Sequence, residues 1–140
     1  MDGIVGVYGL HDRELVNKVY LATAACQHRG KASTGLAVGA RKGIYIHKSL
    51  GRIAEVVDAD LMRVFHDLKP TAAIGNIGYT KRKVAEKINA EPIGIRPRKR
   101  SRYRVVLTMD GYLVKEDDLK AELERDYAFE TENKTEVVGA

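Results

Sequence analysis

Apolar residues occur along the chain in short runs with two periods, one typical of strands and the other typical of helices. Alternating or continuous apolar runs predict five strands, over residues 4–8, 34–38, 44–47, 71–77 and 103–109. Helical spacing predicts helices over 13–26 and 61–68, another that begins at 116, and a last one near 135. Because strands and helices alternate irregularly, the pattern favours an α+β fold, with residues 1–140 forming a single domain.

Turn and capping residues support these boundaries. The stretch 39–43 begins and ends with glycine and carries the signal of a hairpin between two strands. Asp12 can cap the first helix, and Asp58 or Asp60 can cap the helix that reaches residue 68. Residues 81–91 are mostly polar and predict a loop with at most a short helical turn.

Composition narrows the class of protein. Cys26 is the one cysteine of 140 residues, so the chain can form no internal disulfide and no cysteine-rich metal site. No metal-ligand spacing links the four histidines, which are His11, His28, His47 and His66. No apolar run approaches the ~18 residues of a membrane span, and residues 1–7 lack a signal-peptide pattern. We therefore expect a soluble, cytoplasmic domain with no metal, no cofactor and no membrane contact.

The net charge of +5 hides two blocks of opposite sign. Residues 81–104 contain ten basic and two acidic residues, a net charge of +8, and residues 116–136 carry a net charge of −6. The basic block is a candidate site for phosphate or nucleic acid, through Lys81, Arg82, Lys83, Arg96, Arg98, Lys99, Arg100 and Arg102. A solvated loop is the alternative, because Tyr103 alone offers no stacking platform. The two blocks can also attract each other.

Four stretches carry a family resemblance. They are MDGIVGVYG at 1–9, QHRG with STGLAV between 27 and 38, HKSLG at 47–51, and AIGNIGYT with NAEP between 73 and 92. In this order and spacing the chain resembles the N-terminal glutaminase domain of class II glutamine amidotransferases, most closely the glutamine phosphoribosylpyrophosphate amidotransferase type. The resemblance implies an N-terminal nucleophile hydrolase fold, an αββα sandwich, of which residues 1–140 would form the N-terminal half.

The family mechanism begins at a cysteine that directly follows the initiator methionine. Its thiolate attacks the glutamine amide, the freed α-amine can act as base, and ammonia passes to a synthase domain. Asp2 occupies that position here. A carboxylate is a poor nucleophile towards an amide, and Asp is unfavourable for removal of Met1, so we expect Met1 to be retained.

Four further positions depart from the glutaminase pocket that the resemblance implies. Gly78 replaces the arginine that clamps the substrate carboxylate, and Asn76 replaces a histidine. Asp110, which precedes Gly111, replaces the asparagine that donates to the oxyanion, so charge stabilisation becomes repulsion. Lys134 replaces the aspartate that binds the substrate ammonium. We expect the Asp and Lys residues of this former pocket to form internal ion pairs, and a new ligand site is the alternative.

These departures predict a non-catalytic glutamine amidotransferase-like protein that acts as an interaction or regulatory subunit. One alternative is an active glutaminase subunit that supplies ammonia, as in purine biosynthesis, and another is phosphate or nucleic-acid binding through 81–104. Half of a sandwich would expose sheet edges and one apolar face. We therefore expect a homo-oligomer, or a partner protein that completes the fold, with a compact monomer as the alternative.

Overall fold

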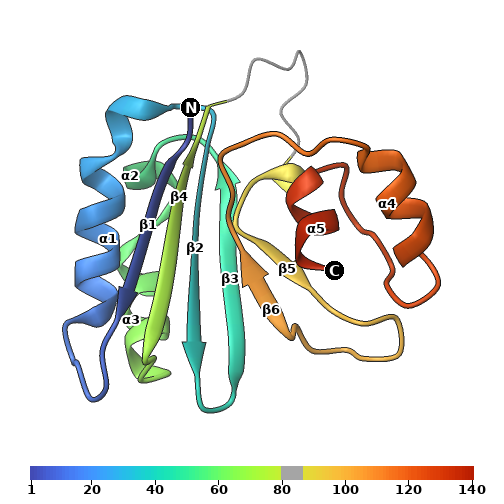
Figure 1. Cartoon of the computed structure of the whole chain (residues 1–140). Coiled ribbons are helices and arrows are strands. Elements are labelled where there is room, and N and C mark those ends of the chain that lie inside the picture. The colour runs from blue at the N-terminus through green and yellow to red at the C-terminus, as the bar shows by residue number, and fades with distance from the viewer. Residues whose placement is uncertain (80–86) are drawn as a thin grey trace.

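The computed structural model describes residues 1–79 and 87–140, in which the strands form two antiparallel sheets. The larger sheet has the strand order β1-β4-β2-β3. Its strands are β1 (Gly3–Tyr8), β2 (Ser33–Ala40), β3 (Gly43–Leu50) and β4 (Ala72–Gly78). The smaller sheet pairs β5 (Ile93–Ile95) with β6 (Val105–Leu107) and lies beside β3 (Figure 1).

Helices accompany both sheets. Those that cover one face of the larger sheet are α1 (Leu15–Ala25), α2 (Ile53–Val56) and α3 (Ala59–Asp67) (Figure 1). Those beside the smaller sheet are α4 (Glu116–Leu123) and α5 (Lys134–Gly139), and α5 packs on both β5 and β6. Two short 3₁₀ turns, η1 (Gln27–Arg29) and η2 (Lys87–Asn89), complete the described elements.

The main core lies between the larger sheet and helices α1, α2 and α3. Side chains alternate across a strand, so every second residue of β2 and β4 faces this layer. The buried members of the core are Leu15, Val16, Val19, Leu36, Val38, Ile53, Val56, Val57, Phe65, Ala73 and Ile77. The intervening strand residues point to the opposite face, which we call the outer face.

The outer face is covered at one side and open at the other. Near β3 it is covered by the smaller sheet, where a Cβ atom added to Gly94 would lie 2.7 Å from Ile46 Cδ1. Near β1 it is open, since Ile4 is 43% exposed and Tyr8 is 73% exposed. Strand β1 pairs with β4 alone among the described strands, so it also forms an edge of the sheet.

Most elements predicted from the sequence are confirmed. The four strands of the larger sheet occur within three residues of the predicted bounds, and Asp58 caps α3, because its Oδ1 accepts from the Leu61 N–H at 2.8 Å. Helix α1 begins at Leu15 rather than at 13, because Asp12 Oδ1 accepts from the Glu14 N–H at 2.9 Å and holds a turn before the helix.

Two parts of the prediction are wrong. The strand predicted over 103–109 is limited to β6, and beyond its end the Met109 N–H donates to the Glu91 carboxylate instead of continuing the ladder. Helix α2 and strand β5 were not predicted, and both are very short. Of the loop predicted over 81–91, residues 81–86 lie outside the described residues, and η2 agrees with the short helical turn that the prediction allowed.

Candidate functional site

Asp2 and Asn76 meet at the end of the larger sheet where the chain begins. The antiparallel pairing of β1 with β4 places Gly3 opposite Ile77, so Asp2 lies near the end of β4. Asp2 Oδ2 accepts from Asn76 Nδ2 at 3.4 Å, and Asp2 Oδ1 accepts from the Tyr79 N–H at 2.9 Å. Both carboxylate oxygens of Asp2 are therefore engaged within the chain.

Asn76 links this end of the sheet to the segment after β6. Its side chain is fully buried on the outer face, and its Nδ2 also donates to Thr108 Oγ1 at 2.9 Å. Asn76 Oδ1 is buried and accepts no hydrogen bond from the described residues. A buried acceptor without a hydrogen bond costs free energy. Among the described residues, Asn76 Oδ1 is the one buried side-chain polar atom in this state.

Glu91 is the centre of a polar network that joins the two sheets. Its side chain is buried, and Glu91 Oε2 accepts from the Thr108 hydroxyl at 2.5 Å and from the Met109 N–H at 2.7 Å. Glu91 Oε1 accepts from the Thr135 hydroxyl and from Asn133 Nδ2. Four donors from two segments, residues 108–109 and residues 133–135, thus converge on one carboxylate, which offsets much of the cost of its burial.

A second buried carboxylate, that of Glu136, fixes the start of α5. It accepts from the Glu130 N–H at 2.8 Å, and from both the N–H and the hydroxyl of Thr131 at 2.8 and 2.7 Å. Asn133 caps the same helix, because its Oδ1 accepts from the Thr135 N–H at 3.0 Å. These contacts position Asn133 and Thr135 as donors to Glu91.

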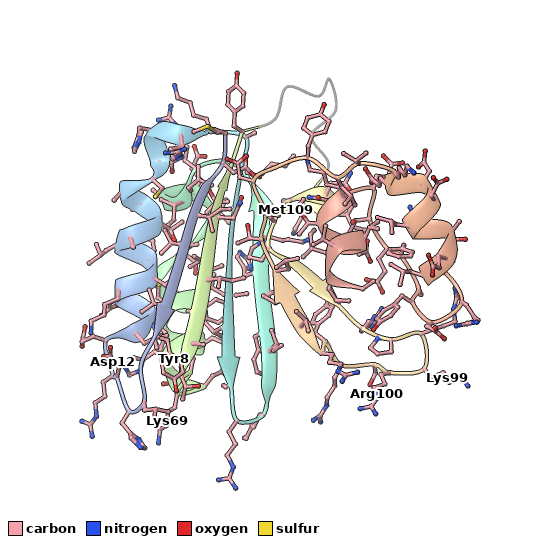
Figure 2. All side chains as sticks on the ribbon, viewed as in Figure 1. Tyr8, Asp12, Lys69, Lys99, Arg100 and Met109 are labelled. Atoms are coloured by element: carbon pink, nitrogen blue, oxygen red, sulfur yellow. The ribbon has the colours of Figure 1, made fainter. Side chains whose placement is uncertain are left out.

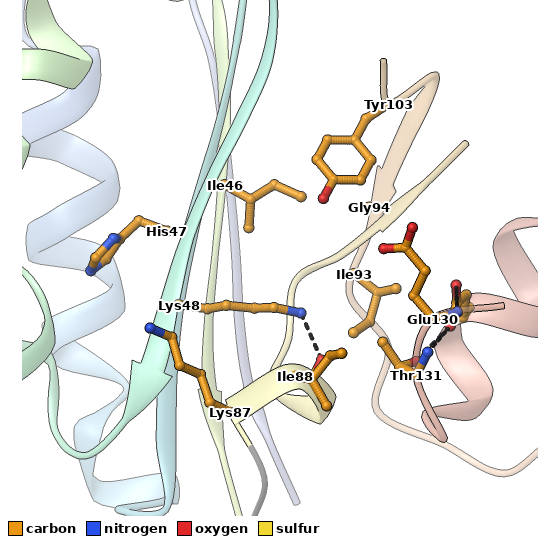
Figure 3. A pocket seen from close by; sticks show the side chains of 11 residues that line it. Ile46, His47, Lys48, Lys87, Ile88, Ile93, Gly94, Tyr103, Glu130 and Thr131 are labelled. Atoms are coloured by element: carbon orange, nitrogen blue, oxygen red, sulfur yellow. Dashed lines mark hydrogen bonds between the residues drawn. The ribbon is translucent and has the colours of Figure 1, made fainter. Parts of the chain in front are cut away.

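A cavity of about 250 Å³ lies between β3 and the elements around β5 and α5 (Figure 3). Lys48 reaches into it from β3, and its Nζ donates to the Ile88 carbonyl at 3.0 Å and to the Ala90 carbonyl at 2.7 Å. Burial lowers the pKa of Lys48, while the charges of Glu136, Glu91 and Glu130 act against this shift. Lys48 thus ties β3 to the segment that carries Glu91.

The other predicted pocket residues do not join this network. Asp110 and Gly111 are exposed, and Lys134 Nζ lies 4.9 Å from the centre of the Tyr112 ring. Gly78 is buried, and a Cβ atom added there would overlap the Ser33 hydroxyl as it is oriented in the structure. The predicted ion pairs are wrong for the described residues, where no salt bridge links Lys134 to Asp2 or Asp110.

The basic block divides into anchored and exposed residues. Arg96 pairs with Glu130, and the Arg98 guanidinium donates to the Glu124 carbonyl at 2.6 Å and to the Tyr127 carbonyl at 3.2 Å. The side chains of three others are exposed: Lys99, Arg100 and Arg102. Lys81, Arg82 and Lys83 lie outside the described residues. The Arg96 pair is one contact between the basic and acidic blocks.

Sequence reasoning missed Glu91, Thr108 and Thr135, which carry most of the buried network. Glu91 was noted only as part of the NAEP stretch. Its partners lie 17 to 44 residues away along the chain, so no local spacing reveals them. The part of the chain that the structure describes contains no cluster of three His, Cys, Asp or Glu side chains able to hold a metal ion.

No helix among the described residues is both long and apolar enough to cross a membrane.

Comparisons with known proteins identify relatives of this chain. Amidophosphoribosyltransferase of Synechococcus elongatus is 29% identical over 120 residues, which are 84% of this chain and 23% of that protein. Glutamine–fructose-6-phosphate aminotransferase of Bacillus thuringiensis is 30% identical over an alignment 142 positions long, gaps included, which covers 99% of this chain and 21% of that protein. A solved structure described as the allosteric regulatory enzyme of purine biosynthesis matches 99% of this chain and 28% of its own, with a TM-score of 0.79 and 26% identity. No protein-family model matches.

The chain is thus homologous to class II glutamine amidotransferases, and it has the α+β fold of the N-terminal nucleophile hydrolases, as the resemblance predicted. Within that class its relatives include amidophosphoribosyltransferases and glutamine–fructose-6-phosphate aminotransferases. The chain spans about a fifth to a quarter of the length of these curated relatives.

Proposed function

We propose that this chain is a non-catalytic glutamine amidotransferase-like protein that acts as an interaction or regulatory subunit. The observation that carries the proposal is that position 2 holds an aspartate whose carboxylate is already hydrogen-bonded within the chain. Asp2 offers no thiolate there, and its two carboxylate oxygens accept hydrogen bonds from Tyr79 and Asn76. A carboxylate held in this way is a poor nucleophile towards an amide.

Cys26 is badly placed to take over the missing role. It follows α1, and a Cβ atom added to Gly3 would lie 2.7 Å from Cys26 Cβ. Gly3 faces the helix side of β1, whereas Ile4 and its partner Asn76 lie on the outer face. The thiol of Cys26 is therefore separated from Asp2 and Asn76 by the sheet itself.

A glutaminase assay tests the catalytic part of this proposal. Freshly purified protein given L-glutamine is expected to release no more ammonia than the Asp2→Ala and Lys134→Ala variants, because nucleophile and substrate clamp are both missing. Intact-mass spectrometry of the same sample is expected to find Met1 retained. Ammonia release by the unaltered chain above both variants would establish the alternative, an active glutaminase subunit.

The open part of the outer face supports the interaction part of the proposal. Ile4 and Tyr8 are exposed on the edge strand β1, and Gly6 between them leaves the backbone accessible. An exposed edge with apolar side chains favours pairing with another chain. We assign this edge to a second copy, because two antiparallel β1 strands related by a two-fold axis would extend both sheets and bury the same residues twice.

Light scattering during size-exclusion chromatography tests this assignment. The unaltered chain is expected to be a dimer at micromolar concentration, and an Ile4→Lys, Tyr8→Lys double variant is expected to be a monomer, because charged residues on an edge strand oppose pairing. Val64→Lys is the control for an added surface lysine, since Val64 is 56% exposed on α3, which covers the face of the sheet opposite to the outer face. A monodisperse monomer for the unaltered chain would contradict the assignment.

A further inference from the structure

The connection between β5 and β6 is the most basic segment of the described chain. Residues 96–104 contain six Lys and Arg residues and no acidic residue. Neither the fold of the relatives nor the proposed function explains such a concentration of charge. The structure divides these six residues into two groups with different tasks.

The first group holds the loop in place. Arg96 pairs with Glu130, and Arg98 donates through its guanidinium to the carbonyls of Glu124 and Tyr127. The Arg98 N–H also donates to the Asp126 carbonyl at 2.9 Å, and Pro97 forms an isolated antiparallel β-bridge with Tyr127. These contacts fasten the start of the loop to the segment that follows α4, so the loop has a defined shape.

The second group presents its charges to solvent. Its members are Lys99, Arg100, Arg102 and Arg104, all of them exposed. Within the described part of the chain, no hydrogen bond or salt bridge uses the charged end of any of the four. Four unneutralised cations on an anchored loop repel one another, and this repulsion is relieved when anions bind.

Other turns extend the positive charge along the same end of the molecule. The turn between β2 and β3 carries exposed Arg41 and Lys42 and lies at the end where the β5–β6 connection lies (Figure 1). Lys69, which precedes β4, lies at this end together with Lys99 and Arg100, whereas Met109 is far from it (Figure 2). These cations are spread across the width of two sheets, so they are too far apart to bind one small anion together. Their spacing suits an extended polyanion instead.

We propose that this end of the molecule, which we call the basic end, binds the sugar–phosphate backbone of double-stranded nucleic acid without reading its sequence. Arginine supplies three of the four exposed charges on the loop, and its planar guanidinium matches the oxygens of a phosphate. Backbone contacts of this kind carry affinity but little sequence information.

The aromatic and apolar content of the loop favours a duplex over other polyanions. Tyr103 is 37% exposed and its ring packs on Gly94, so this one aromatic side chain offers only part of its surface to the unpaired bases of a single strand. Attachment to an anionic membrane ordinarily combines basic residues with apolar side chains that insert into the bilayer. Residues 98–102 contain no apolar side chain, which argues against that partner.

Fluorescence anisotropy with labelled duplex DNA and duplex RNA tests the proposal. If four to six phosphates are contacted, raising the salt concentration from 50 to 200 mM weakens binding roughly 10²–10³-fold. The triple variant Lys99→Gln, Arg100→Gln, Arg102→Gln is expected to lower the slope of log affinity against log salt by about 3, one for each lost phosphate contact. Arg96 and Arg98 stay unchanged because they hold the loop.

A charge-matched variant separates the basic end from overall charge. Lys31→Gln, Arg63→Gln, Lys115→Gln also removes three exposed cations, and it is expected to retain the salt slope of the unaltered chain. Circular dichroism verifies that both triple variants are folded. The proposal is overturned by equal losses in the two variants, by no salt-sensitive binding to either duplex, or by tighter binding to single strands or to phosphatidylserine vesicles at equal salt. None of these outcomes depends on glutaminase activity or on dimer formation.

Discussion

Replacing Glu91 with alanine is expected to lower the free energy of unfolding by about 3–5 kcal/mol, because the change removes one partner from a buried, hydrogen-bonded network. The carboxylate of Glu91 accepts from the hydroxyls of Thr108 and Thr135, from the Met109 N–H and from Asn133 Nδ2. Alanine supplies no acceptor, so the buried Thr135 hydroxyl and three half-buried donors lose their partner. A buried donor left unsatisfied costs about 1–3 kcal/mol, and a half-buried one costs less because water can reach it.

Urea denaturation followed by circular dichroism measures this effect. Glu122→Ala is the matched control, because Glu122 is an exposed residue of α4 and its loss is expected to change the free energy of unfolding by less than about 0.5 kcal/mol. Glu91→Gln is expected to fall between the two, since an amide keeps one acceptor and places a donor against the remaining donors. A Glu91→Ala variant as stable as Glu122→Ala would show that the network contributes nothing to folding.

Gly35→Ala is expected to destabilise the protein by about 3 kcal/mol through overpacking. Gly35 lies on the outer face of β2, where a Cβ atom would overlap the Glu91 carbonyl oxygen and lie 2.6 Å from Pro92 Cδ. Both neighbours are main-chain or ring atoms that no side-chain rotation can move away. The segment carrying Glu91 would have to move off the sheet, and the hydrogen bonds of its carboxylate would lengthen with it.

Gly6→Ala is the control for this substitution. Gly6 also lies on the outer face, on β1, and a Cβ atom there would have no neighbouring atom within 4 Å. Alanine in a strand is no less favourable than glycine, so Gly6→Ala is expected to leave the urea midpoint unchanged or slightly raised. Equal midpoints for Gly35→Ala and Gly6→Ala would show that the Glu91 segment adapts freely.

The sequence predicted the larger sheet well because each of its strands is a local apolar run bounded by glycine, proline or a polar turn. Strand β5 escaped prediction because its three residues follow Pro92 directly, and their burial depends on α5 and Ile46, which lie far away in the chain. Asp58 was predictable as a cap because capping is a contact between near neighbours.

The candidate site was predictable in part, because contacts that follow from local patterns can be predicted and contacts between distant segments cannot. The contact between Asp2 and Asn76 follows from pairing β1 with β4, which two strong apolar runs already suggest. Family resemblance placed Lys134 and Asp110 in one pocket, but the Lys134 ammonium lies over the Tyr112 ring instead. A cation over an aromatic face is a stable alternative to an ion pair, and no sequence spacing distinguishes the two.

The hydrogen-bond network also sets an order of events for the nascent chain. Strands β1 to β4 and helices α1 to α3 are complete once Gly78 has left the ribosome, and most of the apolar core is then in place. The carboxylate of Glu91 must wait for Asn133 and Thr135, which are made more than forty residues later. Until then a half-satisfied carboxylate and an uncovered sheet face coexist, so this interval of synthesis is the stage at which the chain most needs protection by a chaperone.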